Sequence, residues 1–171
     1  KKTTIGITAN GFYSPGKFLS TSDINIFNPG HALLGKTFGK ADNSSTWKHF
    51  GTNLNFRHVF DTTGREITAD IDHLRYNVDN SQSLFNRYEN STGGYSMLPD
   101  TLYGNLPQQI RIYTAKVDYV HPFKNGLKFE AGLKTGFVET DNDARYDSLL
   151  NNSMKLDSAR RNHFVYDEYI N

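Results

Sequence analysis

The sequence predicts an all-β fold: an antiparallel, up-and-down sheet of about five to six long strands that is not a closed barrel by itself. Apolar and polar residues alternate in several segments, as they do on the two sides of a strand, and helical spacing is nearly absent. The alternating segments run to about 12 residues, beyond the five or six of an ordinary soluble strand. That length meets the nine to eleven residues that cross a bilayer on a tilt.

Six strands are expected, at about residues 3–14, 47–60, 66–78, 110–121, 127–139 and 163–171. The fourth and fifth form a hairpin, because Asn125-Gly126 is a turn dipeptide between two alternating segments. Short turns are predicted at 61–65 and 122–126. Long polar segments at 28–46, 79–109 and 140–162 are rich in Asn, Ser, Gly and Asp, and we expect long loops there. All 171 residues belong to one partial barrel domain in this interpretation.

Alternation divides the strand residues into two sets. The expected lipid-facing set is apolar: Phe50, Leu54, Phe56, Ile67, Ile71, Tyr113, Val117, Tyr119, Leu127, Phe129, Leu133 and Phe137. The expected lumen-facing set is polar: Asn53, Asn55, Arg57, Asp70, Asp72, Lys116, Asp118, Lys128, Glu130 and Lys134. Aromatic residues near the strand ends favour a lipid interface, although cross-strand pairs in a soluble core would use the same residues. A transmembrane β-barrel segment is therefore the leading interpretation.

Composition excludes little beyond cysteine chemistry. A net charge of +1 gives no electrostatic reason to expect nucleic acid, and the lack of Cys excludes disulfides, thiolate metal sites and a Cys nucleophile. Backbone groups in hydrocarbon must pair within a closed barrel, which needs at least eight strands. The chain also stops inside the aromatic-rich run "NHFVYDEYIN". We therefore expect a fragment whose remaining strands lie elsewhere in a longer polypeptide.

One stretch is specific enough to suggest a family. The run "GNLPQQIRIYTAKVDYVHPFKNGLKFEAGLKTGFVETDNDARYD", followed by "RNHFVYDEYIN", resembles the barrel region of TonB-dependent receptors, an outer-membrane β-barrel family. The upstream "WKHFGTNLNFRHVFDTTGREITADIDHLRYN" resembles the preceding hairpin.

The resemblance implies a piece of a receptor in the outer membrane of a Gram-negative bacterium that takes up a scarce, bulky ligand. Its implied partners are outer-membrane lipid, its own plug domain, the remaining barrel strands and the TonB complex. The tight turns would face the periplasm and the long loops the outside.

No catalytic, cofactor-binding or metal-binding residues are expected, and we predict no enzyme. Ligand contacts are expected in the outer loops through exposed aromatic residues, namely Phe85, Tyr88, Tyr95 and Tyr103. Two alternatives remain open. A soluble β-sandwich binding or adhesion module would bury its apolar faces against each other. An outer-membrane barrel enzyme would need a convergent Ser, His and acid at the rim.

Overall fold

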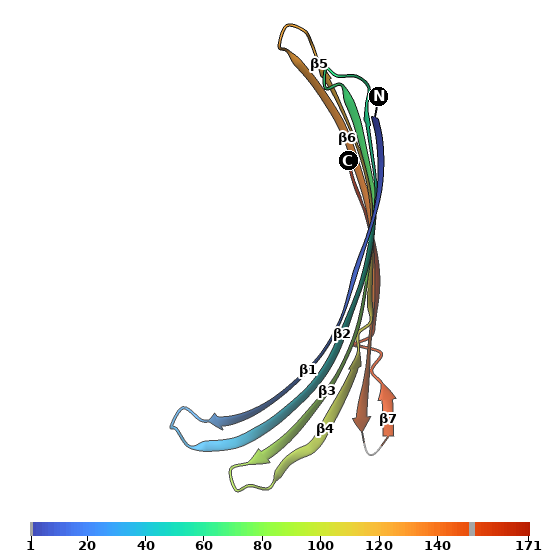
Figure 1. Ribbon diagram of the computed structural model, residues 1–171. Helices are drawn as coiled ribbons and strands as arrows, with labels where there is room; N and C mark the ends of the chain where they lie inside the picture. The colour runs from blue at the N-terminus through green and yellow to red at the C-terminus, as the bar shows by residue number, and fades with distance from the viewer. Residues whose placement is uncertain (1, 151–152) are drawn as a thin grey trace.

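The computed structural model describes residues 2–150 and 153–171, and they form a single curved antiparallel sheet (Figure 1). Its strands are β1 (Lys2–Phe27), β2 (Leu33–Val59), β3 (Glu66–Asn90), β4 (Tyr95–Asn105), β5 (Gln108–Pro122), β6 (Lys128–Leu150), β7 (Ser153–Leu156) and β8 (Asn162–Ile170). The all-β, up-and-down prediction is therefore confirmed. In the described parts of the chain, no helix is long and apolar enough to cross a membrane.

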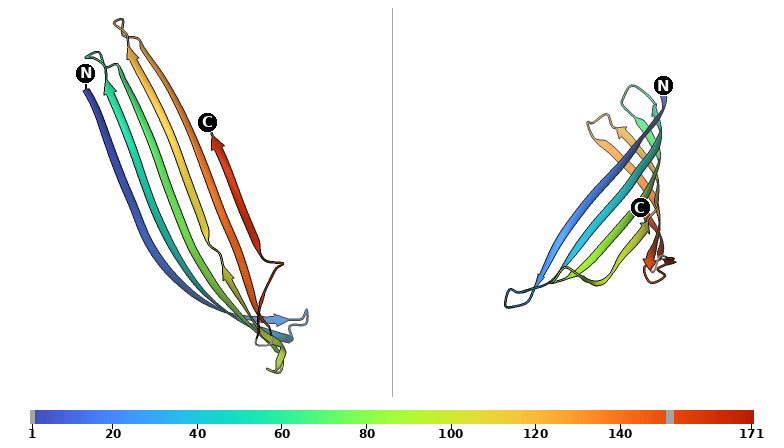
Figure 2. Two further views of the ribbon diagram at one scale, coloured as in Figure 1. Left: turned by 90° about the vertical axis from the view of Figure 1, so that its right-hand side faces the viewer. Right: turned by 90° about the horizontal axis from the view of Figure 1, so that it is seen from below.

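The strands follow one another across the sheet in chain order (Figure 2). β3 pairs with β5 up to Val78 and with β4 from Ser81 onward, so β4 and β5 act as one interrupted strand. Pro107 lies at the interruption, where a residue without an N–H group leaves a gap in the hydrogen-bond ladder. β1 lies at one edge and pairs only with β2 among the described residues, so the sheet is open.

The two segments predicted as short turns connect β2 to β3 and β5 to β6. Phe60 and Phe123 each donate a backbone hydrogen bond across their turn, to Arg65 and Leu127 respectively. Gly126 has φ of 83°, a left-handed conformation that favours glycine, as the Asn-Gly dipeptide suggested. Both turns lie at the upper end of the sheet in Figure 1, which we call the turn end.

The three segments predicted as long loops differ from the prediction. Most of 28–46, 79–109 and 140–162 is strand, and within the described ranges these segments keep only short connections, such as 28–32 and 91–94. Backbone pairing needs no alternation of side chains. Where both faces of a sheet contact water, neither has to be apolar, and the sequence shows no period. β1, β2 and β3 therefore run far beyond the segments that alternation identified, and their lower ends curve to one side (Figure 1).

The sheet has almost no core of its own. Val78 is the only hydrophobic residue in the described chain that counts as buried, while large apolar residues such as Ile7 and Leu133 are 79% and 75% exposed. A soluble β-sandwich would pack a second sheet on these residues, but residues 2–150 and 153–171 form one sheet. The sandwich alternative therefore has no support in the fold.

Candidate functional site

Strand register places polar and apolar residues on opposite faces of the sheet. Asn55, Asp70, Lys116 and Lys134 lie directly opposite one another on β2, β3, β5 and β6. The next row along the strands consists of Ile5, Phe56, Ala69, Val117 and Leu133. Neighbouring rows point to opposite faces because side chains alternate along a strand.

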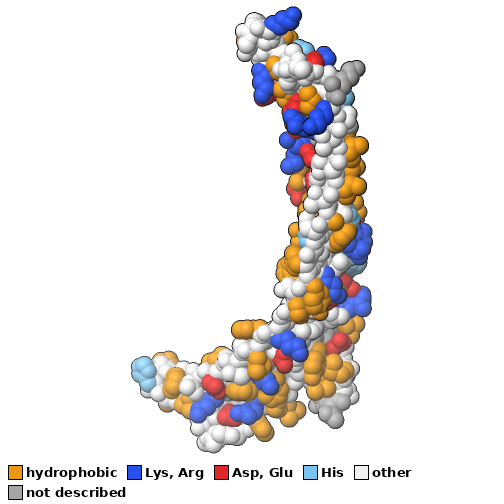
Figure 3. All heavy atoms as spheres, in the orientation of Figure 1, with side chains coloured by type: hydrophobic (Ala, Val, Ile, Leu, Met, Phe, Trp, Pro, Cys, Tyr) orange, Lys and Arg blue, Asp and Glu red, His pale blue; other side chains and the backbone are white. Residues whose placement is uncertain are grey.

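Figure 3 relates these rows to the curvature of the sheet. In the upper half, charged side chains gather on the concave side and hydrophobic ones on the convex side. We call the face with Lys116 the concave face and the face with Leu133 the convex face.

An aromatic row crosses the convex face near the turn end. Its ring centroids are 4.7 Å apart for His58–Phe60, 6.4 Å for Phe60–Tyr119 and 4.6 Å for His121–Phe123. The Arg65 guanidinium lies 5.0 Å from the Phe60 ring centroid. The Tyr119 and His rings, each with an apolar body and a polar atom, suit the boundary between hydrocarbon and water, and the neighbouring Phe rings add bulk on its apolar side.

A second aromatic row, the far aromatic row, crosses the same face lower down. Its centroid distances are 4.8 Å for His73–Tyr113, 6.3 Å for Tyr113–Phe137 and 4.8 Å for Phe137–Tyr169. Phe129 and Phe137 are about 27 Å apart along β6 at about 3.4 Å per residue. A tilt of about 40° reduces this to about 21 Å, close to the apolar band of about 25 Å on outer-membrane barrels. The two rows therefore bracket a surface of the height that a bilayer covers.

The concave face carries a hydrogen-bonded polar network at the same height. Asp72 accepts hydrogen bonds from Asn53 Nδ2 at 2.8 Å and from Thr114 Oγ1 at 2.7 Å, which joins β2, β3 and β5. Asn55 Nδ2 donates to Asn53 Oδ1 at 3.2 Å. These groups are part-buried and hydrogen-bonded, so this part of the concave face, which we call the polar wall, is both polar and ordered.

Ion pairs continue the polar wall toward the turn end. Arg57 Nη2 lies 2.6 Å from Glu66 Oε2, Lys116 pairs with Asp118, and Lys128 pairs with Glu130. Most of these side chains are substantially exposed, so each pair contributes little to stability. Their effect is to line the concave face with both signs of charge.

Beyond the far aromatic row the polarity of the two faces reverses. The concave face now carries Phe12, His49 and Tyr76 in one row, with centroid distances of 5.2 Å and 4.4 Å. The convex face carries charged residues such as Lys48 and Arg111. Figure 3 shows the change below the middle of the sheet, where Lys and Arg lie along the convex edge. This reversal was not predicted. Its signal lies on β5, where the apolar residues occupy odd positions from Tyr113 onward but even positions before it, at Ile110 and Ile112.

Register puts the two predicted residue sets on opposite faces. All ten residues of the predicted lumen-facing set lie on strands, in register rows of the concave face. The strand residues of the predicted lipid-facing set lie in rows of the convex face, and Leu127 precedes β6 in the turn. The solvent that each face contacts is a separate inference, which the family supports below.

The four aromatic residues predicted to contact ligand lie on strands, not on loops. Phe85 and Tyr88 belong to β3, and Tyr95 and Tyr103 belong to β4. Phe85 and Tyr103 lie on the convex face, whereas Tyr88 falls on the concave face by alternation. The four residues therefore do not converge on one surface.

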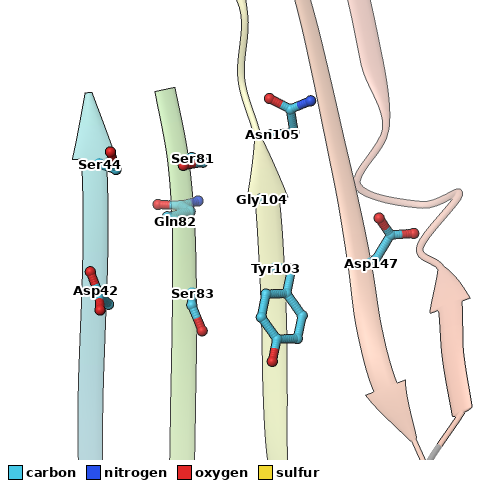
Figure 4. A pocket seen from close by; sticks show the side chains of 9 residues that line it. All are labelled: Asp42, Ser44, Ser81, Gln82, Ser83, Tyr103, Gly104, Asn105 and Asp147. Atoms are coloured by element: carbon cyan, nitrogen blue, oxygen red, sulfur yellow. The ribbon is translucent and has the colours of Figure 1, made fainter. Parts of the chain in front are cut away.

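A shallow polar hollow lies beside Tyr103 on the lower part of the sheet (Figure 4). It is lined mainly by small hydroxyl, amide and acidic side chains from β2, β3, β4 and β6, including Asp42, Ser83 and Asp147. Its openness to solvent and its lack of a convergent charged pair make it a surface depression. Among residues 2–150 and 153–171, no cluster of three or more His, Asp or Glu side chains is arranged to hold a metal ion.

Several ionisable groups outside the bracketed band have pKa values shifted by a hydrogen bond. The hydrogen bond from Thr63 lowers the pKa of Asp61 in the β2–β3 turn. The hydrogen bond from Arg145 lowers the pKa of Asp143 on β6, and the hydrogen bond to Asp79 raises the pKa of Lys48. All three shifts keep the charged forms in place near neutral pH.

Comparison with known proteins agrees with this geometry. The model of the outer membrane protein beta-barrel family matches residues 58–171, about two thirds of the chain. The match includes β3 to β8 and hence most of the apolar band. No curated protein matches the chain. The chain belongs to the outer membrane protein beta-barrel family, and its place is the outer membrane of a Gram-negative bacterium.

Proposed function

We propose that this chain is a segment of a TonB-dependent outer-membrane receptor that takes up a scarce, bulky ligand. The observation that carries the proposal is the concave wall: at the height of the apolar band it bears the Asp72 hydrogen-bond network and a series of ion pairs. A wall of this kind suits a lumen that contacts water or a polar protein domain. Binding and transport, not catalysis, is the function that such a wall supports.

The open edges of the sheet indicate what completes the barrel. β1 has a 26-residue outer edge, and exposed backbone groups cannot remain unpaired in hydrocarbon. We propose that further strands of the same polypeptide pair with this edge. A plug domain would then occupy the space beside the concave wall and connect the receptor to TonB.

The unequal ends of the sheet support an orientation. β2 and β3 extend far past the far aromatic row, whereas the turn end closes within a few residues of the other row. Outer-membrane barrels have short periplasmic turns and longer extracellular parts. In the proposed orientation, the turn end faces the periplasm and the extended strands project outside the cell.

The ligand path would follow the concave face. Of the four aromatic residues first considered, Tyr88 is then the one placed to meet ligand, and Tyr103 is a matched control on the convex face. We expect Tyr88→Ala to weaken ligand uptake by the intact receptor and Tyr103→Ala to leave it unchanged. Equal effects of both substitutions, or none, would contradict a concave ligand path.

The receptor function itself is tested by genetics. A strain lacking the protein and a strain lacking TonB are grown in media that each limit one scarce nutrient, and uptake of that nutrient is measured. We expect one uptake defect shared by both strains and rescued by the intact gene. A defect that appears without the protein but not without TonB would refute energy coupling.

A further inference from the structure

Two arginines lie directly opposite each other on the convex face. Arg75 on β3 pairs in register with Arg111 on β5, one row beyond His73 and Tyr113 of the far aromatic row. The neighbour of Arg75 on the other side is Phe50. Like charges in directly opposed positions destabilise a sheet, so this arrangement calls for an anion.

Protein groups balance this charge only in part. Arg111 Nη1 lies 2.9 Å from Glu139 Oε1, and its Nη2 donates a hydrogen bond to Gln109 Oε1. Lys48 Nζ lies 2.9 Å from Asp79 Oδ2. Arg75 Nε donates a long hydrogen bond of 3.4 Å to Asn77 and makes no ion pair with any side chain in the described ranges. Its guanidinium therefore keeps most of its donors for a ligand.

The height of the pair identifies the kind of anion. The first row beyond an aromatic row on the apolar face lies at the level of lipid headgroups. In the proposed orientation this is the outer leaflet of the outer membrane, which consists of a glycolipid with phosphorylated sugars. Guanidinium groups bind phosphate oxygens in pairs of parallel hydrogen bonds. Arg75 can offer such a pair from its two terminal nitrogens, which have no protein partner among the described residues, and Arg111 opposite adds a second positive charge and its remaining N–H groups.

We propose that Arg75 and Arg111, with Lys48 nearby, bind a phosphate of the outer-leaflet glycolipid. The Lys48–Asp79 pair is exposed, and such pairs are weak enough for Lys48 to turn toward a phosphate. The row continues with Glu139 on β6 and Asp167 on β8, so the anion site ends at β5. The inference rests on the proposed function only for the choice of leaflet.

The test uses the intact outer-membrane protein that contains these strands, purified and freed of lipid in detergent. Its binding to lipid A and to phosphatidylglycerol is compared for the native protein and for the double variant Arg75→Gln/Arg111→Gln. The control Lys128→Gln/Lys134→Gln removes the same charge from the concave face. Folding of each variant is checked by the shift of its unheated band in gel electrophoresis.

We expect the native protein and the control to bind lipid A more tightly than phosphatidylglycerol. The double variant should bind lipid A at least about tenfold more weakly, because charge-assisted hydrogen bonds from two guanidinium groups are lost. Unchanged binding by the double variant would overturn the site. If the native protein binds lipid A no more tightly than phosphatidylglycerol, and the double variant loses phosphatidylglycerol binding as well, the assignment to the outer-leaflet glycolipid would be overturned. A failure of TonB-dependent uptake would leave these results as they are, so the two proposals fail separately.

Discussion

Leu133 offers a direct test that the convex face contacts hydrocarbon. It lies midway along β6 between Phe129 and Phe137 and is 75% exposed. It is four residues, or about 14 Å at about 3.4 Å per residue, from each of these aromatic residues, which places it near the middle of the proposed bilayer span. Lysine on the lipid face at this depth costs about 2–4 kcal/mol. Leu133→Lys should therefore lower the folding equilibrium constant about 30- to 700-fold.

The assay is urea-induced unfolding of the intact protein from lipid vesicles, followed by tryptophan fluorescence and gel mobility. The matched control is Thr68→Lys, which adds the same charge on the concave face, in the row of Arg57 and Asp118. A surface substitution of this kind changes stability by about 0.5 kcal/mol or less. Equal destabilisation by the two substitutions would refute the assignment of the two faces to two different solvents.

Two further predictions concern the connections at the turn end. Gly126→Ala should destabilise the protein by about 1 kcal/mol in urea unfolding, because Gly126 has φ of 83°, which an L side chain rarely adopts. The control is Gly136→Ala, measured in the same way, because the Cβ added there meets only ordinary contacts at 3.7 Å or more. The lowered pKa of Asp61 predicts that its contribution to stability is complete above the ordinary value of 3.8 and is lost as the pH falls through the lower value of the folded state. Asp61→Asn should remove this part of the acid dependence in unfolding curves from about pH 5 to about pH 2, and an unchanged acid dependence would contradict the role of the Thr63 hydrogen bond.

The sequence predicted the fold well where two solvents act on one strand. In "LKFEAGLKTGFVE" the apolar Phe129 and Leu133 alternate with the charged Glu130 and Lys134, as expected of a strand with hydrocarbon on one face and a polar lumen on the other, so the alternation is visible in the sequence. The same reasoning identified the hairpin at Asn125-Gly126. The strands were therefore predictable wherever their two faces differ in polarity.

Strand length was not predictable from the same signal. "KADNSSTW" in β2 pairs residue by residue with β3, for example Asn43 with Gln82, although neither face is apolar. Backbone hydrogen bonds between strands require no pattern of side-chain polarity when both faces contact water. Pro99 lies within β4, where the β3–β4 register shifts, and proline is a residue that argues against a strand in sequence analysis.

The placement of functional side chains was predictable only in part. The alternation of polar and apolar residues along each strand assigned Asp72 and Lys116 to the polar face, because alternation can be read within a single strand. The opposition of Arg75 and Arg111 depends on the register between β3 and β5, which no single strand reveals. The separation of Tyr88 from Tyr103 likewise follows from pairing between strands.

The most direct test of the account is a spin-label scan of β6 in the intact protein in lipid. These 171 residues contain no Cys, so once any Cys elsewhere in the intact protein is replaced, a single Cys substitution from 128 to 137 carries the label at one known position. We expect collisions with oxygen, which concentrates in hydrocarbon, to be frequent at Phe129, Ala131, Leu133 and Phe137. Collisions with a water-soluble nickel complex should be frequent at Lys128, Glu130 and Lys134. Accessibility without a period of two, or nickel access on both faces, would contradict a strand between lipid and lumen.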